Sequence, residues 1–400
     1  MHLLTAAHDF YPDPGSGGSG RYVYETSRRL VDRGHRVSVV TRRRGEVPRR
    51  ETVEGVEVYR YDLEVADRPA TGILGQLGSA SAAVAEGVSA ATAGAPPDVF
   101  SVQGPVTGLL VGRNLDSVPV VPTFHSPWPV EYCLRTRRSR SAPRRCVNAA
   151  ARWGLQRGIL AAADRVVTLS EFMRRTLDRV YGPGVEVCVV PGGVDAERFS
   201  PAEGPGEHVN RGDPAFLTVR RLSERMGHGL LLAAFSSVVE RHPPAHLYVA
   251  GDGPLRDRLE RRATDLGLDD HVTFLGYVPD RTLPALYADA DVFVLPTTEL
   301  EGFGLATLEA LAAGTPAVGT PVGGTVEVLS AFDADPAVGA PALVPSVDAP
   351  ALAEAMCAWS DLDGDALARA GAAARRHATE RFSWRRTVRE LETLYRPSAG

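Results

Sequence analysis

The sequence predicts an α/β protein of two domains, each built around a parallel β-sheet. Its 400 residues exceed the usual size of one compact domain, so each domain has enough chain to bury its own core. Short runs rich in β-branched residues alternate with helix-like segments of about 10 to 15 residues, which is typical of βαβ units. A composition of 44% hydrophobic and 23% charged residues is that of a folded globular protein.

The expected strands form two series along the chain. The first comprises residues 37–41, 118–123, 165–170 and 185–190, and the second comprises residues 215–219, 246–251, 272–276, 291–296 and 316–320. Between them, residues 191–214 are rich in Pro, Gly and charge, as linkers are. We therefore expect domains at 1–200 and 201–383. Two helices, at 364–381 and 384–396, are expected to close the chain, with a break around Phe382 and Ser383.

Charge and cysteine content narrow the function classes. The net charge is −5, but residues 1–200 hold 26 Arg against 21 acidic residues, whereas residues 201–400 hold 18 against 28. The two halves are therefore expected to meet different partners. The four cysteines are scattered without a CxxC pair, which argues against a disulfide framework or a zinc site. The N-terminus does not resemble a signal peptide and no apolar stretch approaches the length of a membrane span, so we expect a cytoplasmic chain.

A glycine-rich loop, PDPGSGGSG, precedes the first expected helix, which stops at Gly34. Glycines at 15, 17, 18 and 20 would let the backbone approach a ligand, and the amides at a helix start favour an anion. The spacing is neither the dinucleotide-binding GxGxxG nor a Walker sequence, which a chain without lysine cannot contain. A flexible turn without a ligand is the alternative interpretation of this loop.

The sharpest signal is EGFGLATLEALAAGTP, which follows an expected strand. Glu301 and Glu309 stand about two helical turns apart. The amides at the helix start lie between them, at Phe303, Gly304 and Leu305. This pattern suits a glycosyl nucleotide, because helix amides can hold a diphosphate while the two carboxylates accept from sugar and ribose hydroxyls. Either glutamate alone would be ordinary on an amphipathic helix.

No metal site is expected. Three Asp-x-Asp pairs occur, beginning at Asp289, Asp333 and Asp363. The first precedes an expected strand instead of ending it, and the other two fall in loop or cap contexts. A leaving diphosphate would then be stabilised by arginine, backbone amides and helix dipoles.

Residues 134–158 carry eight arginines and no acidic residue; the arginines are Arg135, Arg137, Arg138, Arg140, Arg144, Arg145, Arg152 and Arg157. Such a block can attract anionic lipid headgroups, an anionic acceptor or nucleic acid. Nucleic acid is the weaker interpretation, because the protein is acidic overall and no aromatic stacking pattern is interleaved with the arginines. We expect no nucleic-acid partner. A disordered or solvated arginine loop is the alternative to membrane contact through residues 135–157.

The chain resembles, over almost its whole length, the retaining nucleotide-sugar glycosyltransferases of the GT-B fold, family 4. The resemblance rests on PGSGGSGRYV, RGHRVSVVT, TFHSPW, VPGGVDAERFSP, LTVRRLSERMG, VAGDGPLRDRL, VTFLGYVPDRTLPALYADADVFVLPT, EGFGLATLEALAAGTP and RFSW. It implies two Rossmann-like parallel-sheet domains that face each other across a cleft. The domain at 1–200 would bind acceptor and the domain at 201–383 would bind donor. The final helix, about 384–400, would cross back to the first domain.

The resemblance also implies roles for individual residues. Glu301 would contact the sugar within an E-x7-E motif, Arg221 would neutralise the diphosphate, and His125 would lie beside the sugar. The other residues expected to contact the donor are Gly17, Gly18, Arg220, Arg225, Gly251, Gly253, Tyr277, Val278, Phe303, Gly304, Leu305 and Glu309. Structural alternatives are a satisfied histidine at a strand end for His125, a surface charge for Arg221, and a tight turn for GDGP.

One position departs from the family pattern G-R-L-x-x-x-K-G. Residues 220–227 read Arg-Arg-Leu-Ser-Glu-Arg-Met-Gly, so Met226 takes the lysine position and cannot donate to phosphate. We expect that Arg220, in place of the usual glycine, or Arg225 supplies the second cation.

The resulting expectation is a metal-independent, cofactor-free hexosyltransferase that retains anomeric configuration. Its donor would be a nucleotide-diphosphate sugar, and its acceptor a hydroxyl on a lipid-linked or envelope glycan or on a soluble small metabolite. The alternatives are a GT-B sugar-phosphate synthase or phosphorylase, and a catalytically silent nucleotide-sugar binding protein, against which the intact pair of Glu301 and Glu309 argues. Peripheral contact at the inner face of the membrane is the expectation that accompanies the arginine block.

Overall fold

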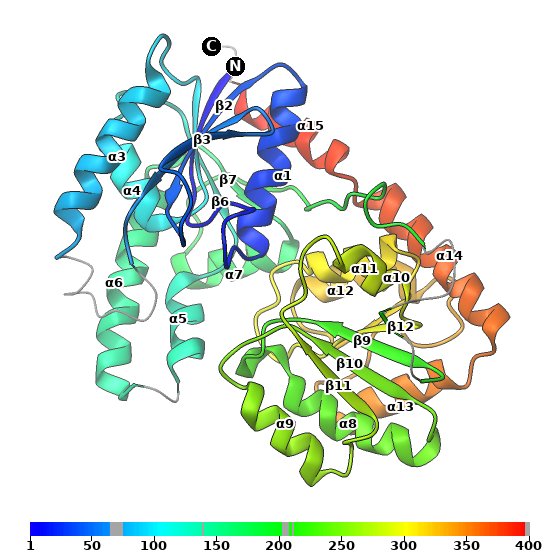
Figure 1. Cartoon of the computed structure of the whole chain (residues 1–400). Coiled ribbons are helices and arrows are strands. Elements are labelled where there is room, and N and C mark those ends of the chain that lie inside the picture. The colour runs from blue at the N-terminus through cyan, green and yellow to red at the C-terminus, as the bar shows by residue number, and fades with distance from the viewer. Residues whose placement is uncertain (65–74, 138–139, 202–207, 210–211, 397–400) are drawn as a thin grey trace. The chain divides into compact units, whose positions relative to one another are not determined.

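The computed structural model describes residues 1–64, 75–137, 140–201, 208–209 and 212–396 (Figure 1). The chain forms two compact units, unit 1 (Met1–Pro191 and Trp384–Gly400) and unit 2 (Gly192–Ser383). The boundary lies at residues 191–192, close to but before the expected residue 200. Residues 192–200 belong to unit 2 because they contact other parts of that unit. Val194 bridges to Ser383, and the ring of Phe199 packs edge-on against that of Tyr287 with centroids 5.9 Å apart.

Unit 1 is built on an eight-stranded sheet with the order β3-β4-β2-β1-β5-β6-β7-β8. The strands are β1 (His2–Ala6), β2 (Arg36–Arg42), β3 (Arg50–Val53), β4 (Val56–Tyr61), β5 (Val99–Val102), β6 (Val120–Phe124), β7 (Val166–Thr168) and β8 (Val187–Val189). The sheet is parallel, as expected, except at one edge, where β3 pairs antiparallel with β4. The cause is the two-residue turn Glu54-Gly55, in which both residues have positive φ, as a tight hairpin requires.

The helices of unit 1 cover both faces of this sheet. They are α1 (Gly18–Asp32), α3 (Leu77–Thr92), α4 (Pro105–Gly112), α5 (Trp128–Thr136), α6 (Ala142–Ala161), α7 (Glu171–Tyr181) and α15 (Trp384–Tyr395). Figure 1 shows α1 and α15 together on one face and α3 and α4 on the other. A core of buried residues that includes Leu4, Val84, Phe100 and Leu110 fills the space between α3, α4 and the strands. The last helix buries Trp384, so the end of the chain completes unit 1.

Unit 2 is built on a five-stranded parallel sheet with the order β11-β10-β9-β12-β13. Its strands are β9 (Ala215–Val219), β10 (His246–Ala250), β11 (Val272–Gly276), β12 (Val292–Leu295) and β13 (Ala317–Gly319), one for each run expected from the sequence. Its helices are α8 (His228–Arg241), α9 (Arg256–Asp265), α10 (Leu283–Ala288), α11 (Leu305–Ala312), α12 (Gly324–Asp333), α13 (Ala349–Ser360) and α14 (Gly364–Arg381), with a 3-10 turn at Glu224–Met226. Figure 1 shows α8, α9 and α13 on one face, and α10, α11 and α12 on the other.

The strand order of unit 2 fixes where a ligand can bind. From β9 the chain proceeds to β10 and β11 on one side, and it then returns to β12 and β13 on the other side. Open α/β sheets bind ligands at the carboxyl ends of their strands, where the order reverses in this way. The loops after β9 and β12 therefore define the candidate site in this unit.

Candidate active site

Arg220 and Glu301 come from these two loops and form a buried ion pair. The guanidinium Nη2 of Arg220 donates to Glu301 Oε2 at 2.5 Å, and the two side chains are only 9% and 10% exposed. Thr297 Oγ1 donates to the same carboxylate oxygen at 3.2 Å. Burial is the largest single influence and raises the pKa of Glu301, but the charge and hydrogen bond of Arg220, the Arg225 charge and the Thr297 hydrogen bond together lower it below its ordinary value, so the carboxylate is ionised at neutral pH.

Glu309 is oriented by a residue that sequence reasoning missed. Tyr287, a buried residue of α10, donates its hydroxyl to Glu309 Oε2 at 3.1 Å. Burial and the neighbouring Glu309 charge raise the pKa of Tyr287 well above its ordinary value, so the phenol keeps its proton. Thr315 Oγ1 donates to the Tyr287 carbonyl at 2.6 Å and fixes the residue further. The available sequence signal was the position of Tyr287 in the motif LPALYADAD.

The start of α11 lies between the two glutamates in the sequence. Gly304 is its N-cap with φ 97°, and no side chain caps this end. The first-turn amides are therefore free of a side-chain partner and suited to an anion. The Phe303 ring packs against that of Phe382 with centroids 5.9 Å apart, and the residue is 4% exposed, so only its backbone can face a ligand.

Backbone contacts fix the loop that carries Arg220. The Arg220 amide donates to the Ala250 carbonyl at 2.9 Å. Gly251 has φ 129°, and a Cβ at this position would lie 2.0 Å from the Arg220 carbonyl oxygen. A Cβ at Gly253 would lie 2.4 Å from the Leu222 carbonyl oxygen. The two glycines thus allow the loop after β10 to lie directly against the Arg220 loop.

A second set of close contacts holds the backbone of Glu301, and it was not predicted. The Gly324 amide donates to the Glu301 carbonyl at 2.9 Å. Gly323 has φ 62°, and a Cβ there would lie 2.1 Å from the same carbonyl oxygen. Arg225 Nη1 donates to the Leu300 carbonyl at 2.8 Å. The sequence signal for the glycines was the GTPVGG segment that follows the last expected strand of the sheet.

Arg221, Tyr277 and Val278 lie after strands of the same sheet. Arg221 is exposed, and within the described part of unit 2 its side chain makes no hydrogen bond or ion pair. Tyr277 directly follows β11 and is 76% exposed, whereas Val278 is half-buried. These side chains remain candidates for contact with the base and the diphosphate.

His125 lies at the end of β6 in unit 1. Its Nε2 is 2.8 Å from Gln103 Oε1, and its ring meets that of Tyr22 edge-on with centroids 5.3 Å apart. The amide nitrogen of Gln103 donates to Ser101 and Thr123, which leaves Oε1 to accept from the histidine. The network therefore assigns the proton to Nε2 and leaves Nδ1 as an acceptor. Burial lowers the pKa of His125 to about 4, so the ring is neutral at pH 7.

The glycine-rich loop begins α1. Gly17 is the N-cap and Gly18 the first helical residue, and no side chain caps this end. A Cβ at Gly17 would meet no atom within 4 Å, whereas one at Gly20 would lie 2.0 Å from Ser16 Oγ. Gly17 thus has no described atom beside it, whereas a side chain at Gly20 would require the Ser16 hydroxyl to move.

The aspartates of the Asp-x-Asp pairs hold backbone segments in place. Asp289 Oδ2 accepts from the His208 amide at 2.9 Å, and Asp291 Oδ2 accepts from the Ala215 amide at 2.8 Å. Asp333 Oδ1 accepts from the Ala342 amide at 2.6 Å, and Asp363 caps α14. Among the residues that the structure describes, no cluster of three His, Cys, Asp or Glu side chains could hold a metal ion.

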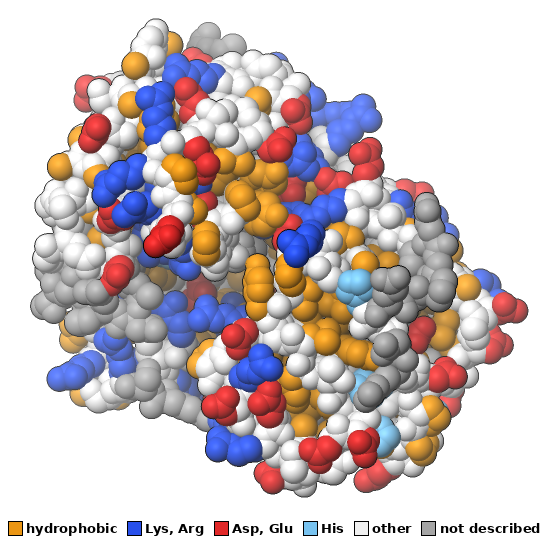
Figure 2. All heavy atoms as spheres, in the orientation of Figure 1, with side chains coloured by type: hydrophobic (Ala, Val, Ile, Leu, Met, Phe, Trp, Pro, Cys, Tyr) orange, Lys and Arg blue, Asp and Glu red, His pale blue; other side chains and the backbone are white. Residues whose placement is uncertain are grey.

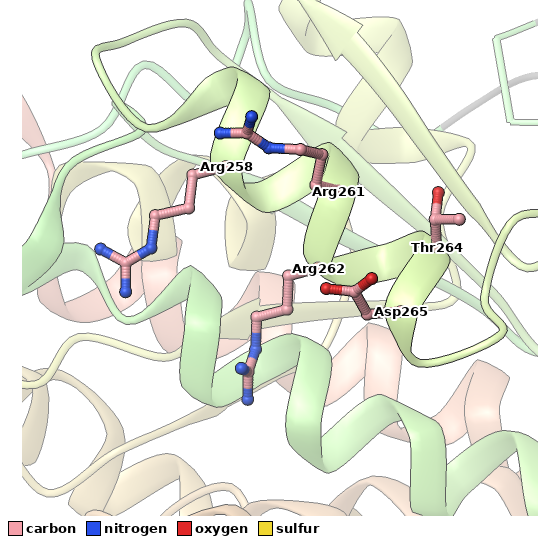
Figure 3. A pocket seen from close by; sticks show the side chains of 5 residues that line it. All are labelled: Arg258, Arg261, Arg262, Thr264 and Asp265. Atoms are coloured by element: carbon pink, nitrogen blue, oxygen red, sulfur yellow. The ribbon is translucent and has the colours of Figure 1, made fainter.

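An open pocket elsewhere in unit 2 is lined by five residues of α9 (Figure 3): Arg258, Arg261, Arg262, Thr264 and Asp265. Figure 3 shows the three guanidinium groups pointing in different directions. Arg258 donates to Glu224 at 3.0 Å. Because the charges do not converge, we assign this pocket no role.

The arginine block is mostly helical, which corrects its interpretation as a disordered or solvated loop. Arg138 lies outside the described residues. Arg152 is buried with its guanidinium 3.9 Å from the centroid of the Tyr132 ring, so it is not available to an external partner. Arg145 donates to the carbonyls of Arg137 and Arg140.

Helix α6 carries the second half of the arginine block. It buries mainly polar side chains and exposes several apolar ones. Three of its four buried residues are polar: Asn148, Arg152 and Gln156. Its exposed side carries Val147, Trp153 and Leu155, which are 69%, 39% and 36% exposed. Figure 2 shows basic side chains gathered over the part of the surface formed by α5 and α6.

The buried polar face of α6 holds the loop that follows His125. Gln156 Oε1 accepts from the Trp128 amide at 2.8 Å, and its Nε2 donates to the Ser126 carbonyl at 3.0 Å. Helix α6 therefore contacts the loop after His125 through its buried side. No helix in the described ranges is long and apolar enough to cross a bilayer.

Two α/β units, each built on a mainly parallel sheet, are the architecture of the GT-B glycosyltransferases. A solved structure supports this fold: HepE of Anabaena in complex with UDP and glucose superposes with a TM-score of 0.70 at 20% identity, and the alignment covers 98% of each chain.

Two family descriptions divide the chain between them. Residues 16–198 match Glycosyltransferase Family 4, and residues 203–377 match Glycosyl transferases group 1. A D-inositol 3-phosphate glycosyltransferase of Saccharomonospora viridis is 31% identical over 95% of this chain and 89% of that protein. The chain belongs to glycosyltransferase family 4.

A more similar relative aligns over a shorter range. The GDP-mannose-dependent alpha-(1-6)-phosphatidylinositol monomannoside mannosyltransferase of Mycolicibacterium smegmatis is 34% identical over 58% of this chain. The chain spans 62% of the length of that protein.

Proposed function

We propose that the protein transfers a hexose-type sugar from a nucleotide-diphosphate sugar to a hydroxyl acceptor, with retention of anomeric configuration. The observation that carries the proposal is the pair of separately held carboxylates, Glu301 and Glu309, on either side of the uncapped start of α11. A diphosphate fits the amides, a sugar fits the ionised Glu301, and a ribose fits Glu309. The complex of HepE with UDP and glucose supports a ligand of this kind.

Unit 2 is proposed to bind the donor, and unit 1 the acceptor. In unit 2, Arg220 and Arg221 directly follow β9, and we propose that they bring positive charge to the diphosphate. In unit 1, His125 is neutral and presents an acceptor nitrogen, which suits a sugar hydroxyl. The uncapped amides at Gly17 and Gly18 add a second anion-binding helix start.

The transfer step needs no protein nucleophile in this proposal. The acceptor oxygen forms a bond with the anomeric carbon as the bond from that carbon to the diphosphate oxygen breaks. The departing phosphate oxygen takes the acceptor proton, and attack from the same face retains configuration. Arginine charge and helix amides stabilise the negative charge that develops on the diphosphate, which is a role for preorganised electrostatics and requires no metal ion.

A donor panel tests this function. Purified protein is mixed with UDP-, GDP- and dTDP-sugars, and the melting temperature is measured for each. A tightly bound donor at 100 times its Kd stabilises the folded protein by about 2.7 kcal/mol. Transfer to an acceptor is then followed by NMR of the new anomeric proton. A panel in which no nucleotide sugar raises the melting temperature, or a product of inverted configuration, would contradict the proposal.

The acceptor is proposed to lie at an anionic membrane surface that α6 contacts. Val147 and Leu155 provide exposed apolar area, and Arg144 and Arg157 are exposed basic residues on the same helix. Each basic residue near an anionic surface contributes on the order of 1 kcal/mol. The buried polar side chains of α6 support this proposal, because a water-exposed helix would normally place its polar side chains outward.

A further inference from the structure

We propose that Arg220 replaces the lysine missing at position 226 and is the second cation that faces the donor diphosphate. The inference rests on the proposed function and assigns one residue within it. Met226 leaves this loop with an apolar, 9% exposed side chain where the family usually has an ammonium. The Arg220 guanidinium lies 2.9 Å from the Met226 sulfur, measured from Nη2.

Because of this contact, the Arg220 guanidinium lies beside the position where a lysine side chain at 226 would place its charge. A lysine at this position would carry its ammonium two bonds beyond the place of the methionine sulfur, in reach of the region that the Arg220 guanidinium now holds. The same Nη2 also donates to Glu301 at 2.5 Å. One guanidinium therefore pairs with the buried carboxylate of Glu301. It also supplies positive charge at the ends of β9 and β12, where the strand order of the sheet reverses.

The other nearby basic groups do not take this place. Arg225 donates to the Leu300 carbonyl at 2.8 Å, so its guanidinium holds the backbone next to Glu301. Arg221 is exposed. His228, the first residue of α8, is buried, and burial together with the Arg220 charge lowers its pKa to about 3, so it carries no charge at neutral pH. Of the two candidates expected from the sequence, the geometry favours Arg220 over Arg225.

Arg220 also keeps hydrogen-bond donors beyond the nitrogen that contacts Glu301 and Met226. A guanidinium presents five N–H donors, and the two contacts above engage one terminal nitrogen. The remaining donors can meet phosphate oxygens while the pair with Glu301 persists. We infer that Arg220 links the sugar-binding carboxylate to the diphosphate through one planar group, which an ammonium cannot do in the same fork geometry.

A charge-relocation experiment tests the inference. The variants are Arg220→Ala, Met226→Lys and the double variant, with Arg262→Ala on α9 as a control for loss of an arginine elsewhere in unit 2. Binding of UDP, GDP, UMP and GMP is measured by calorimetry, with thermal unfolding as a check on folding. Arg220→Ala should weaken the diphosphate that the wild type binds by at least about tenfold and leave the monophosphate within about threefold. The double variant should recover at least about threefold of that loss.

The outcomes separate the inference from the function on which it rests. If the wild type binds neither UDP nor GDP, the proposed function fails first. If the wild type binds and Arg220→Ala retains its diphosphate affinity, Arg220 is not the second cation. If Arg220→Ala unfolds, the folded double variant still decides, because its ratio of diphosphate to monophosphate affinity should lie within about threefold of the wild-type ratio when the Met226→Lys substitution has restored the charge. A ratio about tenfold or more below that of the wild type overturns the inference.

Discussion

The hydroxyl of Tyr287 donates to Glu309 across the neighbouring helices α10 and α11, at 3.1 Å. This relationship gives Glu309 one orientation before any ligand arrives. It also predicts how the two residues respond to substitution.

Glu309→Gln should weaken nucleotide binding directly, because a hydrogen bond from ribose to a charged acceptor is worth about 1.5 to 3 kcal/mol. Tyr287→Phe should weaken it less, by about threefold, since the carboxylate remains but is no longer held in place. Calorimetry with the preferred nucleoside diphosphate measures both. Equal losses in the two variants would mean that Tyr287 does more than orient Glu309.

Glu301→Gln should lose most transfer activity while nucleoside diphosphate affinity survives. The carboxylate is proposed to contact the sugar, and the amide keeps its shape but loses its charge. Single-turnover rates and diphosphate affinity are compared with those of the wild type. A diphosphate affinity that falls as steeply as the rate would show that Glu301 serves the nucleotide instead.

His228→Leu should make the protein less sensitive to acid. The folded-state pKa of His228 is lowered to about 3, so the unfolded chain binds more protons than the folded protein below pH 6.5. Stability is therefore lost as the pH falls from about 6.5 toward 3, and this residue alone accounts for about 2 kcal/mol at pH 5. Both ring nitrogens lack a hydrogen-bond partner among the residues that the structure describes, so leucine removes no observed hydrogen bond.

Urea unfolding at pH 7 and pH 5 measures this effect. The loss of stability between the two pH values should be smaller in the variant than in the wild type by about 2 kcal/mol. The pKa values of His8 and His125 are also lowered by burial, and both residues remain in the wild type and the variant, so some acid sensitivity persists. An unchanged loss would mean that His228 is not buried in its neutral form.

Val147→Asp should reduce binding to anionic vesicles, because Val147 is 69% exposed on the outer side of α6 and a carboxylate there repels the surface. Val347→Asp is the matched control, since Val347 is 40% exposed in unit 2. Sedimentation uses vesicles with and without anionic lipid at low and high salt. If the wild type binds neither kind of vesicle, a soluble acceptor becomes the better interpretation; equal behaviour of the two variants would place the contact elsewhere.

Much of the fold could be predicted because its signals are local. All five strands of unit 2 coincide with apolar runs bounded by glycine and proline, and the two last helices are separated at Phe382 and Ser383 as expected. The strands β1, β3, β4 and β5 were missed. The hairpin of β3 and β4 depends on two positive φ angles at Glu54-Gly55, and β1 stands at the very start of the chain, where no preceding pattern sets it off.

The sequence offers candidate site residues, but it does not show the contacts that hold them. Glu301, Glu309 and the arginines of the 220–227 loop could be found by motif. Thr297 and Tyr287, which contact the two glutamates, and Gln103, which contacts His125, could not, because a hydroxyl or amide that orients another side chain carries no sequence pattern of its own. The choice between Arg220 and Arg225 likewise depends on side-chain direction, which spacing does not encode.

The return of α15 to unit 1 has a consequence for biosynthesis. Arg33 of α1 donates to Glu392 of α15 at 2.8 Å, across 359 positions of sequence, and Trp384 packs near Tyr22. Unit 2 consists of a continuous stretch, so all of its chain has been synthesised before α15 is made. Because contacts between distant segments must wait for both partners, the first unit to be synthesised is the last that can complete its structure.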